Sequence, residues 1–353
     1  MPEDLKSSEN LESDLSRPPL PDKQMVDVPA LRGRQGSALR ALFQRQETSL
    51  LMVILIIGIL ATIKNPTFAS SGNLIELGRA TVIYFVMACG ATLVIIGGGL
   101  DFSVGSVFTL GGMVAALLMT STGLWWPLAV AGGVVVGALA GVVNSIIIAR
   151  LGVPPIITTL GTFYFISGLV VVVSDGNDIQ GLPSGFQTMG QGSLLGVPYI
   201  IVYAVVIGIL YWFILEKTRF GYNVRALGGN RTAAIANGLS ARRIDMWLYL
   251  GGGALAALAG VIYTARTGSG QVGAGGPSVT LEVTSAVLIG GTSLFGGLGK
   301  VTGSAFGAIL FAEIDNALAL SDIPALYKNM VVGAILIVAV AADYFRRKRL
   351  YKV

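Results

Sequence analysis

Long apolar runs, separated by short polar or glycine-rich stretches, follow one another from residue 48 to residue 344. The hydrocarbon core of a bilayer is about 30 Å thick, so a helix needs about 20 apolar residues to cross it. The pattern therefore predicts about ten helical crossings, of which the eighth is too short to cross alone. The expected crossings are 48–64, 78–97, 104–120, 126–149, 155–174, 198–215, 246–265, 279–290, 302–320 and 329–344.

Polar segments divide the chain into three parts. Residues 1–46 mix acids, bases and prolines and cannot bury a core, so we expect a disordered cytoplasmic tail. Residues 47–345 form the predicted transmembrane domain, which contains a polar loop at 216–245, and residues 346–353 form a basic cytoplasmic C-terminus. The predicted fold class is an all-α polytopic membrane protein with glycine-broken spans.

The composition excludes several functions. Hydrophobic residues make up 53% of the 353 residues and charged residues only 12%, about half the charged share of a soluble domain. The lack of histidine excludes histidine metal sites and histidine acid–base catalysis. The chain also has no Walker A motif, the nearest miss being Gly299-Lys300 followed by Val301. We therefore expect no enzyme activity, no metal and no cofactor bound by this chain.

The basic residues predict the orientation. Cytoplasmic loops are enriched in Lys and Arg, and two cytoplasmic termini place all 24 basic residues inside except Lys64, Arg79, Arg266 and Lys328. This orientation also explains the net charge of +5. We therefore expect no nucleic-acid partner.

The first glycine break, Gly97-Gly98-Gly99-Leu100-Asp101-Phe102-Ser103, interrupts two apolar runs. Backbone freed inside a membrane must be satisfied by protein or by a water-filled cavity, and transporters build their pathways from such discontinuous helices. An acid at such a place is a functional candidate. The alternative is that Asp101 caps the helix that begins near Ser103.

A second break, Gly290-Gly291-Thr292-Ser293, has the same character. Residues 286–310 echo residues 93–117 at one common offset, although glycine-rich packing segments also resemble each other by composition alone. For the other polar residues in or near the spans, the alternative is a hydrogen bond between helices. The candidate substrate-pathway residues are Asp101, Ser103, Asn144, Glu282, Gly290, Gly291, Thr292, Ser293 and Asn316.

The polar loop 216–245 carries six Lys or Arg residues and is longer than a connector requires. Its centre, Arg231 to Asn237, favours a short helix. The loop is either a docking segment for a soluble partner or a basic surface that lies against anionic membrane lipid.

Five motifs in order resemble the permease subunits of ribose/galactose-type ABC importers. The resemblance covers about residues 48–345 and leaves the tail unmatched. One departure is Val279-Thr280-Leu281, where many relatives carry Tyr-Glu-Leu. The motifs are Gly98-Gly99-Leu100-Asp101-Phe102-Ser103-Val104-Gly105-Ser106, Pro155 to Thr162, Leu227-Gly228-Gly229-Asn230 with Ala233, Ala234 and Gly238, Leu288 to Gly297, and Glu313 to Leu318.

The resemblance implies a machine with several subunits in a bacterial inner membrane. Two permease copies, usually identical, form the pore for a monosaccharide, either a ribose-like pentose or a hexose. A cytoplasmic ABC ATPase subunit binds ATP and Mg²⁺, and a periplasmic sugar-binding protein delivers the sugar. By the same resemblance, the segment that couples the permease to the ATPase contains Arg225, Gly228, Gly229, Asn230, Ala233, Ala234 and Gly238.

Three other functions remain open. One is a secondary carrier coupled to protons or sodium through Asp101 or Glu282, although a carrier has no need of the 216–245 sequence. The second is an ABC permease for a non-sugar solute such as a branched-chain amino acid, and the third is a membrane scaffold or sensor.

Overall fold

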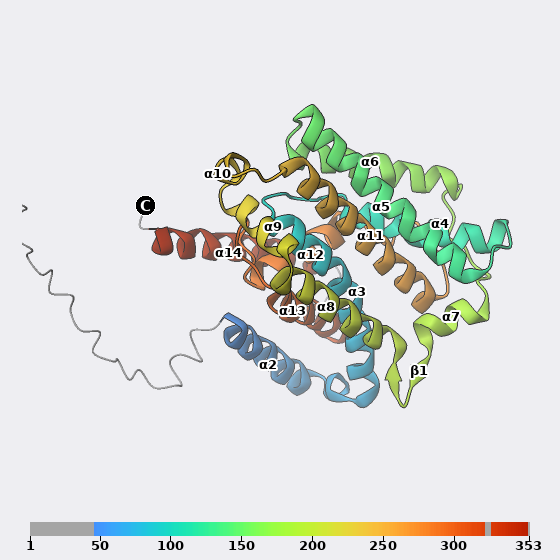
Figure 1. Cartoon of the computed structure of the whole chain (residues 1–353). Coiled ribbons are helices and arrows are strands. Elements are labelled where there is room, and N and C mark those ends of the chain that lie inside the picture. Colours follow the sequence, from blue (N-terminus) through green and yellow to red (C-terminus); the bar gives the residue numbers. More distant parts are fainter. Residues whose placement is uncertain (1–45, 322–325, 352–353) are drawn as a thin grey trace, which may run out of the picture. The chain divides into compact units, whose positions relative to one another are not determined.

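The structure is a computed structural model that describes residues 46–321 and 326–351, most of them helical (Figure 1). Within these residues, eight helices are long and apolar enough to cross a membrane. This confirms an all-α polytopic membrane protein. The eight helices are α2 (Gln46–Lys64), α3 (Ser71–Ile96), α4 (Val104–Ser121), α5 (Trp126–Leu151), α6 (Pro155–Val173), α8 (Tyr199–Lys217), α11 (Ala241–Thr267) and α13 (Val301–Leu320).

The eighth and tenth predicted crossings, 279–290 and 329–344, fall on two further helices. Helix α12 (Pro277–Ile289) is too short to cross alone, as its sequence indicates, and α14 (Leu326–Tyr351) contains a shorter apolar stretch, Tyr327–Val338. The number of ten crossings therefore stays a prediction. Apart from Gln46, the predicted tail lies outside the described residues, as do residues 352–353 of the basic C-terminus.

Small elements join the long helices. A 3-10 helix, η1 (Pro66–Ala69), links α2 to α3, and α7 (Ser184–Gln191) precedes a short antiparallel hairpin. Its strands, β1 (Ser193–Leu194) and β2 (Val197–Pro198), pair Ser193 with Pro198.

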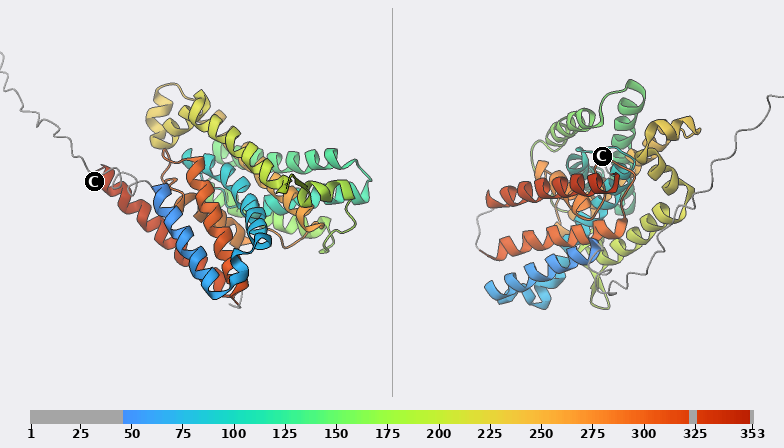
Figure 2. Two further views of the ribbon diagram at one scale, coloured as in Figure 1. Left: turned by 90° about the horizontal axis from the view of Figure 1, so that it is seen from below. Right: turned by 90° about the vertical axis from the view of Figure 1, so that its left-hand side faces the viewer.

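Helix α11 lies at the centre and packs against α3, α4 and α5 (Figure 1). Small residues permit this packing, since a Cβ on Gly112 would lie 2.8 Å from the Gly260 carbonyl oxygen. Close approach of helix backbones is how membrane helices associate where the solvent is itself apolar. By contrast, α2 is mostly exposed and stands beside α13 in both views of Figure 2.

The polar loop 216–245 is more ordered than the sequence predicts. The expected short helix is confirmed as α10 (Arg231–Ala236), but α9 (Arg219–Gly229) precedes it and α11 already begins at Ala241, not at residue 246. Two polar side chains define these boundaries. Thr218 Oγ1 accepts a hydrogen bond from Gly221 N at 3.2 Å, and Asn230 Oδ1 accepts one from Ala233 N at 2.9 Å. Each is an N-cap bond that starts a helix.

Candidate functional site

The first glycine break is a tight turn at the end of α3. Gly98 has a φ of +83°, and Gly99 N donates a hydrogen bond to Val94 O at 3.0 Å. A left-handed residue followed by this backward bond is the usual way to end a helix at glycine. The chain then runs without helical bonding through Leu100 and Asp101 until α4 begins at Val104.

Asp101 begins a buried polar network that joins three segments. Its Oδ1 accepts hydrogen bonds from Ser103 N at 2.8 Å and from Ser103 Oγ at 2.5 Å. Ser103 Oγ in turn accepts one from Asn144 Nδ2 of α5 at 2.9 Å, and Thr162 Oγ1 of α6 donates to Asn144 Oδ1 at 2.6 Å. Both bonds go to Ser103, the N-cap residue of α4, so Asp101 fixes the backbone at the point where the break meets the helix.

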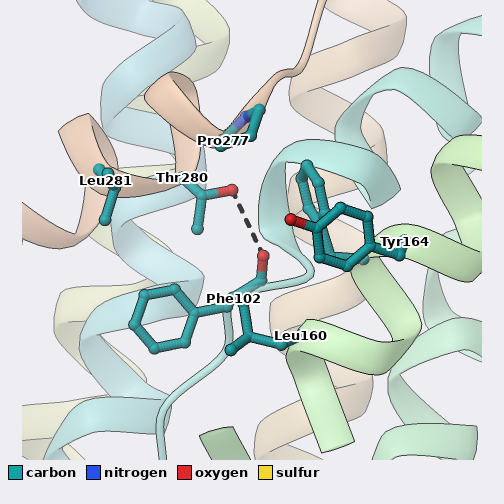
Figure 3. Close-up of a pocket in the computed structure, with 7 residues that line it drawn as sticks. Phe102, Leu160, Tyr164, Pro277, Thr280 and Leu281 are labelled. Carbon is teal, nitrogen blue, oxygen red and sulfur yellow. Dashed lines mark hydrogen bonds between the residues drawn. The ribbon is translucent and has the colours of Figure 1, made fainter. Parts of the chain in front are cut away.

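A half-open pocket of about 170 Å³ lies beside this break, between α6 and the start of α12 (Figure 3). Thr280 points its hydroxyl toward the break, where Oγ1 accepts a hydrogen bond from Gly105 N at 3.0 Å and donates to Phe102 O at 3.4 Å. Thr280 is within the stretch that departs from the Tyr-Glu-Leu of many relatives. The pocket is lined by Phe102, Leu160, Phe163, Tyr164, Pro277, Thr280 and Leu281.

The second break begins with the same turn at the end of α12. Gly291 has a φ of +95°, and Thr292 N donates to Val287 O at 3.2 Å. Beyond it, Ser293 N donates to Leu298 O at 2.9 Å. Thr292 and Ser293 are both buried, so these two candidates face protein in this conformation.

The coupling segment meets both breaks at Gly228. A Cβ on Gly228 would overlap Ile96 O and lie 2.7 Å from Gly297 N. These two atoms also bond to each other, since Gly297 N donates to Ile96 O at 2.8 Å. The end of α9, the first break and the second break are therefore in backbone contact at one point.

Two arginines of the coupling segment are held in ion pairs. Arg225 pairs with Glu216 at the end of α8, and Arg231 Nη2 lies 2.5 Å from Asp245 Oδ2 of α11. Asp245 is buried, and its hydrogen bond raises the pKa of Arg231 above its ordinary value. Both arginines therefore fasten α9 and α10 to the membrane helices.

The other coupling candidates have distinct positions. Gly229 and Ala233 are exposed, Asn230 caps α10, and Ala234 is buried beneath that helix. Gly238 has a φ of +87° and turns the chain toward α11.

Two pathway candidates lie in other clusters. Glu282 of α12 is buried and contacts Tyr84 and Lys328, and Lys328 also bonds to Asp315. Asn316 exchanges amide hydrogen bonds with Asn73 of α3, each 2.8 Å long. Asn316 thus ties α13 to α3, the kind of contact that holds membrane helices together.

The structure brings Asp101, Ser103 and Asn144 together, and it joins the two glycine breaks through Gly228. Sequence reasoning missed Thr162, Tyr84 and Lys328 as partners of the candidates. For Thr162 and Tyr84 the signal is a polar group within an apolar run, which many helix-packing residues share, whereas Lys328 was noted only as one of the external basic residues.

Comparison with known proteins agrees with these features. The family described as "Branched-chain amino acid transport system / permease component" matches residues 73–340. The chain belongs to this permease family. It is 36% identical over 292 residues to the ribose import permease RbsC of Bacillus subtilis, covering 82% of this chain and 90% of RbsC. No solved structure matches this chain significantly.

Two further relatives are named for other sugars. The D-allose transport system permease AlsC of Escherichia coli is 31% identical over 303 residues, covering 86% of this chain and 93% of AlsC. The L-arabinose transport system permease AraH of Escherichia coli is 33% identical, covering 85% of this chain and 90% of AraH. The resemblance predicted from the five motifs is confirmed, and this chain is a multi-pass inner-membrane permease of the group that includes these sugar permeases.

Proposed function

We propose that this chain forms the membrane pathway of an ATP-driven importer for a monosaccharide, either a ribose-like pentose or a hexose. A separate ABC ATPase subunit with ATP and Mg²⁺ would drive transport, and a periplasmic binding protein would deliver the sugar. Both termini would be cytoplasmic, and a second, identical copy would complete the pore. The contact of Gly228 with both glycine breaks carries this proposal, because it joins the coupling segment directly to the broken helices.

In this proposal the first break shapes the pathway. Asp101, Ser103 and Asn144 hold the backbone of the break through buried hydrogen bonds, while the adjacent pocket presents aromatic and aliphatic side chains with one threonine hydroxyl. Ligand pockets typically combine an apolar lining with few polar groups. Movement of α9 by the ATPase would reach both breaks as a rigid-body displacement.

The ATPase-facing surface would lie on α9 and α10. These two helices expose the large side chains Tyr222 and Ile235, which are 65% and 50% exposed. In the proposed orientation they face the cytoplasm and not lipid, and aromatic and apolar side chains there are typical of a protein interface.

The test is purification of the tagged chain from its native host in mild detergent, followed by identification of co-eluting proteins and an assay of ATP hydrolysis. Reversing the charge of Arg231 would leave the buried Asp245 unpaired, so Ile235→Glu is the better variant. We expect the wild type to carry a stoichiometric ATPase and Ile235→Glu to lose it. Leu195→Glu is the matched control, because Leu195 is 98% exposed on the predicted external hairpin.

A chain that elutes alone from several detergents, without ATPase activity, would contradict the proposal and favour an ion-coupled carrier. Sugar uptake that persists with a hydrolysis-dead ATPase partner would do the same.

A second candidate is import of a non-sugar solute, which the description of the matching family favours. The mainly apolar lining of the pocket also suits an apolar side chain. Uptake of labelled ribose, competed with allose, arabinose and leucine, decides between the two. Competition by the sugars but not by leucine is the expected result.

A further inference from the structure

Four ionisable side chains, each from a different helix, form one cluster that includes the hydroxyl of Tyr84. Tyr84 of α3 places its hydroxyl oxygen 2.6 Å from Glu282 Oε2 of α12 and 2.5 Å from Asp315 Oδ2 of α13. Lys328 of α14 places Nζ 2.9 Å from Glu282 Oε1 and 3.0 Å from Asp315 Oδ2. The Glu282 side chain is completely buried.

The two short contacts of Tyr84 need one more proton than the cluster holds when Glu282 and Asp315 are both ionised. A tyrosine hydroxyl carries one proton, and an ionised carboxylate can only accept. Both contacts to Tyr84 lie within the range of short, charge-assisted O–H···O bonds. One hydroxyl proton cannot fill two such bonds, so one of the two carboxyl groups must supply the second proton.

The contacts indicate which carboxyl group holds that proton. Both carboxyl groups contact Tyr84 and Lys328, but Asp315 uses the same oxygen, Oδ2, for both, whereas Glu282 presents Oε2 to Tyr84 and Oε1 to Lys328. Glu282 Oε2 is therefore free of the cation and can hold a proton toward Tyr84. With the proton on Glu282 Oε2, the contacts form a closed ring. Glu282 donates to Tyr84, Tyr84 donates to Asp315, and Lys328 donates to Asp315 while its Nζ lies 2.9 Å from the other oxygen of Glu282.

We propose that Glu282 is a proton-binding site and that the bound proton completes a latch between α14 and helices α3, α12 and α13. The ionisable groups that face Glu282 are Tyr84 of α3, Asp315 of α13 and Lys328 of α14. With Glu282 neutral, the charges of Asp315 and Lys328 balance. This avoids the cost of burying a second, unpaired negative charge.

Loss of the proton would weaken the latch. The O–H bond of Glu282 breaks, the electron pair stays on Oε2 and the proton passes to water. Asp315 and Lys328 are 22% and 32% exposed, and Lys328 lies at the predicted external end of α14, so in that orientation water reaches the cluster from their side. Two negative charges would then share one cation and one hydroxyl proton, which favours separation of α14 from the other helices. This inference rests on the geometry of the four side chains and does not depend on the identity of the transported solute.

The experiment is infrared difference spectroscopy of the full chain in lipid nanodiscs at neutral pH. A protonated carboxylic acid has a carbonyl stretch that is separate from the bands of an ionised carboxylate and shifts in heavy water. We expect the spectrum of the wild type minus that of Glu282→Gln to contain this band. The glutamine amide N–H can donate to Tyr84 as the acid does, so the variant should fold.

Two more variants make the assignment specific. Tyr84→Phe removes the acceptor of the acid proton and should shift the Glu282 band. Glu313→Gln is the matched control, because Glu313 is a second buried carboxyl group, with Oε2 unpartnered. It should leave the Glu282 band unchanged. A difference spectrum for Glu282→Gln with carboxylate bands alone would overturn the proposal.

The pH dependence of thermal stability gives an independent readout. The folded protein holds a proton that the unfolded chain releases at neutral pH, so rising pH should lower the melting temperature of the wild type. The Glu282→Gln variant cannot release this proton, and its melting temperature should fall less over the same range. An equal or steeper fall in the variant would contradict the proposal.

Discussion

The two glycine breaks use the same turn for different purposes. At the first, Gly97 N, Gly98 N and Gly99 N donate to Leu93, Ile95 and Val94. At the second, the hydrogen bonds recur at the same offset, from Gly290, Gly291 and Thr292 to Ala286, Leu288 and Val287. The sequence echo between these segments is therefore also an echo in backbone geometry, centred on left-handed glycines at 98 and 291.

The segments diverge as soon as the turn ends. The first reaches α4 through residues 97–103, whereas the second takes the longer path 290–300 to α13. The first is held by the Asp101 carboxylate, while the second carries Leu294 at the equivalent position and bends through two more left-handed glycines, Gly296 and Gly297. Both breaks thus share the backbone contact with Gly228, but the turn leads into a carboxylate-centred polar network at the first break and into a second glycine bend at the second.

The largest effect is expected at Gly228, where the two breaks meet. In Gly228→Ala, the new Cβ would overlap Ile96 O, and only a backbone shift can make room for it. Overpacking of this kind costs about 1–3 kcal/mol, and the shift should separate α9 from the breaks. We expect a lower melting temperature of the purified chain and loss of ATP-driven uptake in cells.

The neighbouring glycine provides the comparison for stability. No atom lies within 4 Å of a Cβ built on Gly229, so Gly229→Ala should melt close to the wild type. If the two variants lose equal stability, the contact at Gly228 is not what joins the breaks.

The sequence predicted the breaks well because their signal is local. Three glycines followed by an acid cannot continue an apolar helix, and the turn at Gly98 needs only the residues around it. The short helix at 231–236 was equally local. The contact of Gly228 with Ile96 and Gly297 joins segments far apart in the chain, and no local pattern predicts it.

Polar partners were the least predictable part of the site. Asp101 and Glu282 were candidates because an acid is rare in a span, but the bond from Thr162 to Asn144 depends on how α5 and α6 pack. Thr280 was noted only as a departure from the resemblance, yet it bonds to the first break. Tertiary packing selects such partners among many similar polar residues.

Substitutions in the two left-handed turns should lower the stability less than Gly228→Ala, and by similar amounts at the two breaks. Gly98→Ala and Gly291→Ala each place a side chain in the left-handed region, at a cost of about 1–2 kcal/mol. If the turns are equivalent, the two variants should lose similar thermal stability in nanodiscs. Gly161→Ala in α6, with no atom within 4 Å of its Cβ, should be neutral or stabilising. A clearly unequal pair would show that the geometric echo does not extend to the energetics.

The smallest effect is expected at Thr280, which links the helix before the second break to the segment after the first. Thr280→Val keeps the shape of the side chain but removes the hydroxyl that bonds Gly105 N and Phe102 O, which should cost about 1 kcal/mol. Thr280→Ser retains the hydroxyl and should keep most of the stability. Because Thr280 also lines the pocket, the valine variant should raise the half-saturating solute concentration for uptake more than it lowers the maximal rate. Equal behaviour of the serine and valine variants would mean that the hydroxyl does not connect the two breaks.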